Sequence, residues 1–209
     1  MADRPIIFSA PMVRALMAGR KTQTRRILKP QPAPHVQVYR VGADWDWRDG
    51  TRGGALRVPY APGDRLWARE AHAFVPASAY RNSLFVEQRA DPADPDRAAI
   101  FREGFDRSTG GIRWRPSIHM PRWASRLTLL VSDVRVQRLQ DITEADAYSE
   151  GAARWGADGP AGSVHYTACE DFARIWTRLH GPDAWGANPW VAALSFTVHR
   201  QNIDQMVTP

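Results

Sequence analysis

The sequence is poor in cysteine, in lysine and in long apolar runs, and each shortage excludes a class of protein. Its one cysteine, Cys169, excludes an internal disulfide and fits a reducing compartment. The six histidines show no HExxH spacing and there is no CxxC motif, so we predict neither a metal nor another cofactor. No apolar run approaches membrane-spanning length, and residues 1–30 lack the apolar core of a signal peptide. We therefore expect a cytoplasmic protein that does not bind a membrane.

The bulk composition is that of an ordinary globular protein. With 209 residues and 44% hydrophobic residues, the chain can bury a core of its own. The stretch 75–113 is rich in proline, aspartate and glycine turns, which is typical of an insertion with short elements. We predict one domain, 1–209, with an insertion at about 75–113. The sequence does not indicate an oligomeric state.

The excess positive charge is concentrated near the start of the chain. Residues 1–30 carry a formal charge of +6, which equals the charge of the whole chain. Arginine outnumbers lysine by 26 to 2, and both lysines, Lys21 and Lys29, lie in this segment. A lysine can lose its proton when burial or nearby cations lower its pKa, whereas arginine stays charged. Residues 19–26 therefore predict a local anion-attracting site, and the plainer alternative is a solvated charged face.

The apolar pattern predicts short strands alternating with capped helices. Strands are predicted at 6–8, 64–70, 126–140 and 190–198, and helices at about 9–19, 143–151 and 167–181. A change of phase near residues 132–133 indicates a bulge or bend, and 35–57 reads as a poor hairpin or loop. The two-residue period of strand 64–70 places Glu70 at the end of an inward-facing row. The pattern as a whole favours a mixed α+β fold on a curled sheet or small barrel.

The charged segment contains a short motif that points to a family. Gly19, Lys21 and Arg26 form a GxKxxxxR pattern that resembles the signature of the ASCH family, a PUA-like β-barrel family. The motif follows a predicted helix and precedes a Pro-Gly-Asp turn that leads into a strand. With the stretch 114–126, the chain resembles ASCH proteins of phages and prophages, roughly over 5–30, 60–72 and 114–198. The resemblance implies an ASCH/PUA-like small β-barrel with flanking short helices, and a central cleft for a nucleobase or nucleoside.

The same resemblance implies a catalytic site. One family member, a small bacterial amidohydrolase that deacetylates N4-acetylcytidine, uses a Lys, a Thr three residues later and a Glu on the next strand. These roles fall on Lys21, Thr24 and Glu70. The hydroxyl would attack, the carboxylate would accept a proton or orient water, and the amine would stabilise the oxyanion or act as the base. Lys21 and Thr24 face together only if the motif keeps a helical turn.

Three other functions remain open. The chain could be a binding module for a modified nucleoside or single-stranded RNA or DNA, with cations on phosphate and tryptophans on bases. Other ASCH members resemble ribonucleases, so the fold does not fix the chemistry. A non-enzymatic role in phage morphogenesis, with the insertion as a docking surface, is a further alternative. The residues assigned to binding are Arg20, Arg25, Arg26, Lys29, Trp67, Arg69, His119, Arg122 and Trp123.

Each candidate also has a plainer structural explanation. Thr24 could be a surface or capping hydroxyl, and Glu70 could be the partner of an arginine. His119 could be a structural histidine, and the stretch from Trp114 to Trp123 could be a corner of the core. The primary hypothesis is a hydrolase that acts on N4-acylated cytidine or a related modified nucleoside through Lys21, Thr24 and Glu70.

Overall fold

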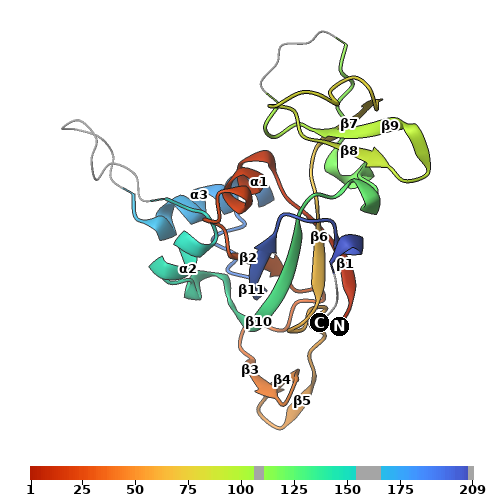
Figure 1. The fold of residues 1–209 in the computed structure, drawn as a ribbon. Coiled ribbons are helices and arrows are strands. Elements are labelled where there is room, and N and C mark those ends of the chain that lie inside the picture. Colours follow the sequence, from red (N-terminus) through yellow and green to blue (C-terminus); the bar gives the residue numbers. More distant parts are fainter. Residues whose placement is uncertain (106–110, 154–165, 207–209) are drawn as a thin grey trace, which may run out of the picture. The chain divides into compact units, whose positions relative to one another are not determined.

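The fold was analysed in a computed structural model, which describes residues 1–105, 111–153 and 166–206 (Figure 1). The chain forms two compact units. The first consists of Met1–Gly19, Gly63–Leu130 and Thr197–Pro209, and the second of Arg20–Pro62 and Val131–Phe196. The predicted insertion lies inside the first unit, and the single-domain organisation stays a prediction.

The first unit begins with a strand and a short helix. β1 (Asp3–Ile7) pairs in parallel with β6 (Arg65–Arg69), and β6 pairs antiparallel with the start of β10 (Thr128–Arg138). α1 (Ala10–Met17) carries Pro11 in its first turn, where proline's missing N–H is harmless, and buries Val13 and Leu16. Gly19 follows with φ of +70°, which confirms the predicted left-handed end of this helix.

A separate three-stranded sheet occupies most of the predicted insertion. Its strands are β7 (His72–Pro76), β9 (Asp94–Phe101) and β8 (Gln88–Asp91), paired antiparallel in that order. Ala99 and Phe101 pack with Met120 on one side, while the intervening Ile100 packs with Ala73 on the other. The insertion therefore has a core on both faces of its sheet. Three short 3-10 helices complete the unit: η1 (Ser117–His119), η2 (Arg122–Ala124) and η4 (Ile203–Gln205).

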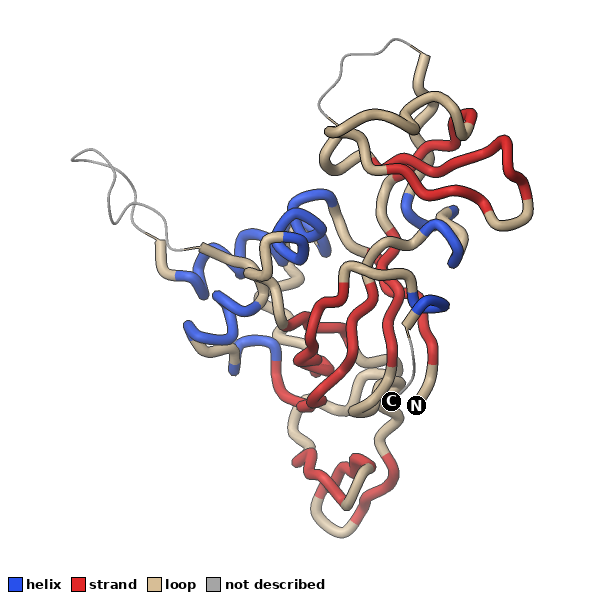
Figure 2. The backbone as a smooth tube through the Cα atoms, viewed as in Figure 1, coloured by secondary structure: helices blue, strands red, loops and turns tan. Residues whose placement is uncertain are grey.

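The second unit packs two helices against its strands. β2 (Gln23–Ile27) pairs antiparallel with β11 (Trp190–His199), and β11 is hydrogen-bonded to β10. η3 (Leu139–Asp141) leads into α2 (Glu144–Ser149), and α2 packs beside α3 (Ala168–His180), as Figure 2 shows. The capping box predicted at the start of α3 is confirmed: Thr167 and Glu170 each accept a hydrogen bond from the other's backbone N–H. The core of this unit includes Leu139, Phe172, Trp176 and Val191.

The stretch predicted as a poor hairpin or loop is a three-stranded antiparallel sheet. Its strands are β3 (Gln37–Val41), β4 (Asp44–Asp49) and β5 (Arg52–Ala55). Both connecting turns use a glycine with positive φ, Gly42 at +60° and Gly50 at +55°. The segment is more regular than the sequence indicated. Its apolar alternation is weak because the strands stay largely exposed.

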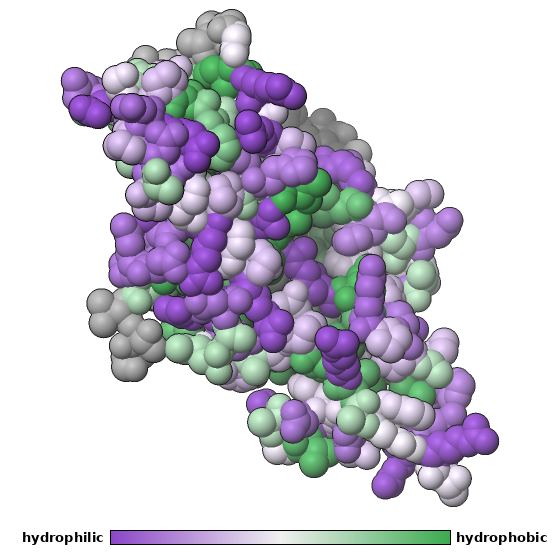
Figure 3. Space-filling model, turned by 90° about the vertical axis from the view of Figure 1, so that its right-hand side faces the viewer, coloured by the Kyte–Doolittle hydropathy of each residue, from purple (hydrophilic) through white to green (hydrophobic). Residues whose placement is uncertain are grey.

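The mixed α+β class is confirmed, while the closed PUA-like barrel stays a prediction. β10 is one continuous strand, and burial of both Val131 and Val134 shows the change of phase that the sequence indicates. Within the described residues, no helix is long and apolar enough to cross a membrane. Hydrophilic residues predominate on the face of the molecule in Figure 3, where hydrophobic residues form separate small areas.

Candidate functional site

Lys21, the centre of the sequence motif, is fully buried in an ion pair. Its Nζ donates to Glu150 Oε2 at 2.6 Å and to the Glu150 backbone oxygen at 2.8 Å. Glu150 is the residue that caps the C-terminus of α2. Burial lowers the pKa of Lys21, and the neighbouring carboxylate opposes that shift. Sequence reasoning missed Glu150, and its only signal was its place at the end of a predicted helix.

Arg25 joins the same buried network. Its Nη1 donates to Glu150 Oε1 at 3.1 Å and its Nη2 to Asp146 Oδ2 at 3.0 Å. Asp146 also accepts from Arg135 at 2.8 Å. Burial acts to raise the pKa of Asp146, but hydrogen bonds from Arg135 and Gln23 and the charges of Arg25 and Arg135 outweigh it, and the pKa is lowered. Both ends of the Arg25 guanidinium therefore face carboxylates, rather than the phosphate that the sequence analysis assigned to it.

Thr24 lies in an extended strand and is also buried. β2 begins at Gln23, so the motif does not keep the helical turn that would bring Lys21 and Thr24 together. Side chains alternate along a strand, which places Thr24 on the face of β2 opposite Arg25. Lys21 shares its partner, Glu150, with Arg25. The other predicted cations of this segment differ in burial: Arg20 and Lys29 are exposed, and Arg26 is half-buried.

Glu70 belongs to the first unit and is held by Arg126. Arg126 Nε donates to Glu70 Oε1 at 2.8 Å and Nη2 donates to Oε2 at 2.9 Å, a bidentate pair with both side chains buried. Burial raises the pKa of Glu70, and the hydrogen bonds and charge of Arg126 oppose that shift. Lys21 and Thr24 belong to the second unit. The structure thus pairs Lys21 with Glu150 and Glu70 with Arg126, and a shared Lys21–Thr24–Glu70 site stays a prediction.

Most of the other predicted binding residues of the first unit already have protein partners. Arg122 donates to Asp3 and to Asp204, each at 2.6 Å. The Arg69 guanidinium lies 5.3 Å from the centre of the Trp67 ring and donates to the backbone oxygen of Ile118. Trp67 is buried, and Trp123 stacks on Phe74 with ring centres 5.7 Å apart. These contacts agree with the structural explanation that the sequence analysis left open for the tryptophans.

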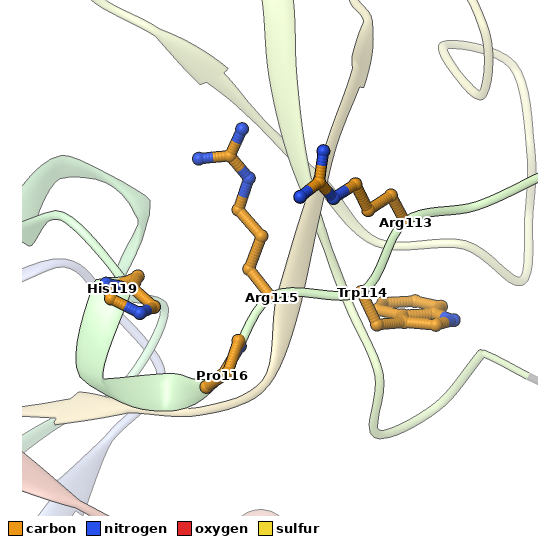
Figure 4. A pocket seen from close by; sticks show the side chains of 5 residues that line it. All are labelled: Arg113, Trp114, Arg115, Pro116 and His119. Atoms are coloured by element: carbon orange, nitrogen blue, oxygen red, sulfur yellow. The ribbon is translucent and has the colours of Figure 1, made fainter.

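A cavity in the first unit is lined by a short cationic stretch. It has a volume of about 370 Å³ and is lined by Arg113, Trp114, Arg115, Pro116 and His119. Figure 4 shows the guanidinium groups of Arg113 and Arg115 extending from the same side of the chain, whereas Trp114 extends to the other side. Both arginines and His119 are exposed, and no carboxylate among the described residues pairs with them.

The cavity is anchored to the sheet of the insertion. Arg115 and His72 exchange two backbone hydrogen bonds, with N···O distances of 2.7 and 3.2 Å. The Arg115 guanidinium lies 4.8 Å from the centre of the Phe74 ring. Burial lowers the pKa of His72, the hydrogen bond to the Glu70 backbone oxygen opposes that shift, and the charges of Arg115 and Arg69 lower the pKa further. Two arginines therefore act on one buried imidazole.

Sequence reasoning found only part of this cavity. His119 was among the predicted binding residues, but Arg113 and Arg115 were not. A usable signal was present, because residues 111–126 contain four arginines and no acidic residue. The prediction placed its main cationic site in residues 1–30, where the net charge is higher, and took only His119, Arg122 and Trp123 from this stretch.

Comparison with known proteins gives no family. No family model matches the chain, and no significant match was found among curated proteins or solved structures. The resemblance to the ASCH family therefore rests on Gly19, Lys21 and Arg26 and on their place in the chain. Function must be argued from the chemistry of the two groups of residues described above.

Proposed function

We propose that the protein is a nucleic-acid-binding module that uses Arg113, Arg115 and His119 as its contact site. The observation that carries the proposal is the gathering of two guanidinium groups and an imidazole around one cavity, without a carboxylate partner among the described residues. Contacts to phosphate dominate nucleic-acid affinity, and arginine is suited to them because its planar fork can donate two hydrogen bonds at once. This function is the binding alternative that the sequence raised.

The pairing of the remaining charges supports this choice of site. Much of the excess charge in residues 1–30 is matched by carboxylates. Arg14 pairs with Glu103 at 2.8 Å, Lys21 with Glu150 at 2.6 Å and Arg25 with Asp146 at 3.0 Å. A cation that already faces a carboxylate attracts phosphate weakly, because the two charges cancel at a distance. The arginines of the cavity have no such partner in the part of the chain that the structure describes.

The proposal is tested by binding of labelled single-stranded RNA and DNA. Fluorescence anisotropy is measured at about 50 mM and about 200 mM salt for the wild type and for Arg113→Glu/Arg115→Glu. The control is Arg52→Glu/Arg57→Glu, which reverses two exposed arginines of the second unit and changes the net charge equally. We expect the cavity variant to lose at least about tenfold in affinity and the control about twofold or less. No wild-type binding at low salt, or equal losses in both variants, would contradict the proposal.

A second candidate function is hydrolysis of N4-acylated cytidine or a related nucleoside, favoured by the state of Lys21. Burial lowers the pKa of Lys21, and its hydrogen-bonded partner Glu150 is a carboxylate that can take up the proton, which would leave a neutral amine able to act as a general base. The carboxylate of that pair is Glu150, whereas the family pattern assigns the role to Glu70. A hydrolytic site could therefore use either acid.

Turnover of N4-acetylcytidine separates these assignments. Rates are compared for the wild type, Lys21→Ala, Thr24→Val, Glu70→Gln and Glu150→Gln. If Glu70→Gln loses turnover and Glu150→Gln keeps it, the family arrangement is favoured. If Glu150→Gln loses turnover and Glu70→Gln keeps it, a Lys21–Glu150 base is favoured. Equal rates in all five proteins would remove hydrolysis as a function. Cleavage of the labelled RNA in the binding assay tests ribonuclease activity at the same time.

A further inference from the structure

We infer that the Arg113–Arg115–His119 cavity takes a terminal phosphate monoester, at the end of an oligonucleotide or on a free nucleotide. The inference rests on the proposed nucleic-acid binding and names the chemical group that the cavity selects.

The direction of the guanidinium groups favours a doubly charged ligand. Arg113 and Arg115 are two residues apart in an extended stretch and extend from the same side of it (Figure 4). A phosphate monoester carries a charge of about −1.5 to −2 at neutral pH, because its second pKa is near 6, whereas an internal phosphodiester carries about −1. Two cations that extend from the same side of one short stretch therefore match a terminal phosphate better than an internal one.

Arg115 is held in place before any ligand arrives. Its backbone is fixed to β7 by the two hydrogen bonds to His72, and the following Pro116 restricts the chain further. Its guanidinium carbon lies 4.8 Å from the centre of the Phe74 ring, and no hydrogen bond from the guanidinium N–H groups to a described residue competes with a bidentate contact to an anion. Little side-chain freedom is then lost on binding.

A neighbouring arginine, Arg97, contacts the same ring but is paired with a carboxylate. Arg97 also lies over the Phe74 ring, at 5.2 Å, but its Nε donates to Asp91 at 2.8 Å. Arg115 shares the ring and has no carboxylate partner in the described part of the chain. The two arginines thus differ in whether a described carboxylate already occupies the guanidinium, which decides whether an added anion can bind there.

The dimensions of the cavity favour one nucleotide end over a long run of chain. A volume of about 370 Å³ is near the lower limit of ligand sites, which span roughly 300–1,000 Å³. His119, on the same cavity, offers a further hydrogen-bond donor or a ring on which a base can stack. The Trp114 ring centre lies 5.4 Å from that of Phe105 and 5.2 Å from the Arg102 guanidinium carbon. These contacts hold the Trp114 ring, so we assign it a structural role in the wall of the cavity.

The test compares one oligonucleotide of about 8 nucleotides in three forms: with a 5′-phosphate, with a 3′-phosphate and with hydroxyls at both ends. Affinity is measured by anisotropy of an internal label. We expect at least one phosphorylated form to bind about tenfold tighter than the hydroxyl form. 5′-CMP should compete with it, and cytidine should not.

Variants assign the preference to the cavity. Arg113→Ala and Arg115→Ala should each abolish the preference for a phosphorylated end, and the exposed control Arg57→Ala should keep it. Arg115→Lys keeps the charge but lacks the bidentate fork, so it should retain binding with a reduced preference. Thermal unfolding midpoints of all variants check that the fold is intact.

The outcomes separate this inference from the proposed function. If all three oligonucleotides bind equally and Arg113→Glu/Arg115→Glu still weakens them, the terminal-phosphate inference is wrong and nucleic-acid binding stands. If none of the three binds at low salt, both fall. If a phosphorylated end is preferred and the preference survives Arg113→Ala and Arg115→Ala, the phosphate is held elsewhere and the inference is also overturned.

Discussion

At the scale of single residues, the main finding concerns Lys21. A lysine at the centre of a basic motif suggests an exposed, anion-attracting amine, but this one is fully buried against Glu150. Burying an ammonium without a partner is strongly unfavourable, so Glu150 is required wherever Lys21 stays charged. The motif residue and the acid at the end of α2 therefore depend on each other.

This dependence predicts a large and non-additive effect on stability. Glu150→Ala leaves the Lys21 ammonium buried without a carboxylate and should lower the free energy of unfolding by about 3–5 kcal/mol. Lys21→Met/Glu150→Ala should lose clearly less than the sum of the two single variants, because the buried ammonium is gone and Arg25, the other partner of Glu150, keeps Asp146. Urea unfolding of the four proteins measures both effects. A loss below about 1 kcal/mol in Glu150→Ala would show that the pair is not buried in solution.

Sequence reasoning could find Lys21 but not its partner. The type and spacing of Gly19, Lys21 and Arg26 are visible in a linear sequence. The contact with Glu150 joins residues 129 positions apart, and nothing in the local pattern encodes it. The bidentate partner of Glu70, Arg126, was likewise invisible, although the general alternative of an arginine partner was weighed and is confirmed.

At the scale of elements, strands and helices with a clear apolar period were predictable. α3 carries a capping box and an apolar stripe, and its start at Thr167 followed from both. β2 was missed because its sequence, Gln-Thr-Arg-Arg-Ile, has little apolar alternation. Its strand is stabilised instead by pairing with β11 and by ion pairs of Arg25, which are long-range contacts.

The parallel pair of β1 and β6 carries a charge cluster that makes its stability depend on pH. Asp3, opposite Arg65 in the register, accepts hydrogen bonds from Arg65 at 2.8 Å and from Arg122 at 2.6 Å. The hydrogen bond from Arg65 is the main cause that lowers the pKa of Asp3 below its ordinary value of 3.8, with Arg122 adding to it and burial opposing it. A carboxylate with a lowered folded-state pKa stabilises the fold above its unfolded pKa. That stability is lost as the pH falls through the folded value.

Asp3→Asn should therefore destabilise the protein at neutral pH and have little effect in strong acid. At pH values above about 4 the wild type has the ionised Asp3 and the variant does not, so their unfolding midpoints should differ. At low pH the protonated Asp3 resembles asparagine, and the midpoints should converge. Urea unfolding of both proteins across this pH range is the measurement. A difference that stays constant with pH would rule out the charge of Asp3 as its cause.

At the scale of the whole molecule, net charge proved a poor guide to where charge is available. Residues 1–30 equal the chain in formal charge, but several of their cations are matched by acids from distant positions. Charge counted along the sequence cannot include such pairing, because the acids come from other elements. The stretch 111–126, with fewer cations, presents two arginines that no described carboxylate pairs with.

Two pairs of substitutions with the same change in net charge test whether binding follows the net charge of a segment or the arginines of the cavity. Arg20→Gln/Lys29→Gln removes the two exposed cations of the sequence motif and its exit, and Arg113→Gln/Arg115→Gln removes the two of the cavity. If affinity for single-stranded nucleic acid followed net charge, both pairs would weaken it equally. Because phosphate contacts are local, we expect the cavity pair to lower the slope of log K against log salt by about two, and the motif pair to change it little. The reverse order of effects would return the binding site to residues 19–29, as the sequence alone suggests.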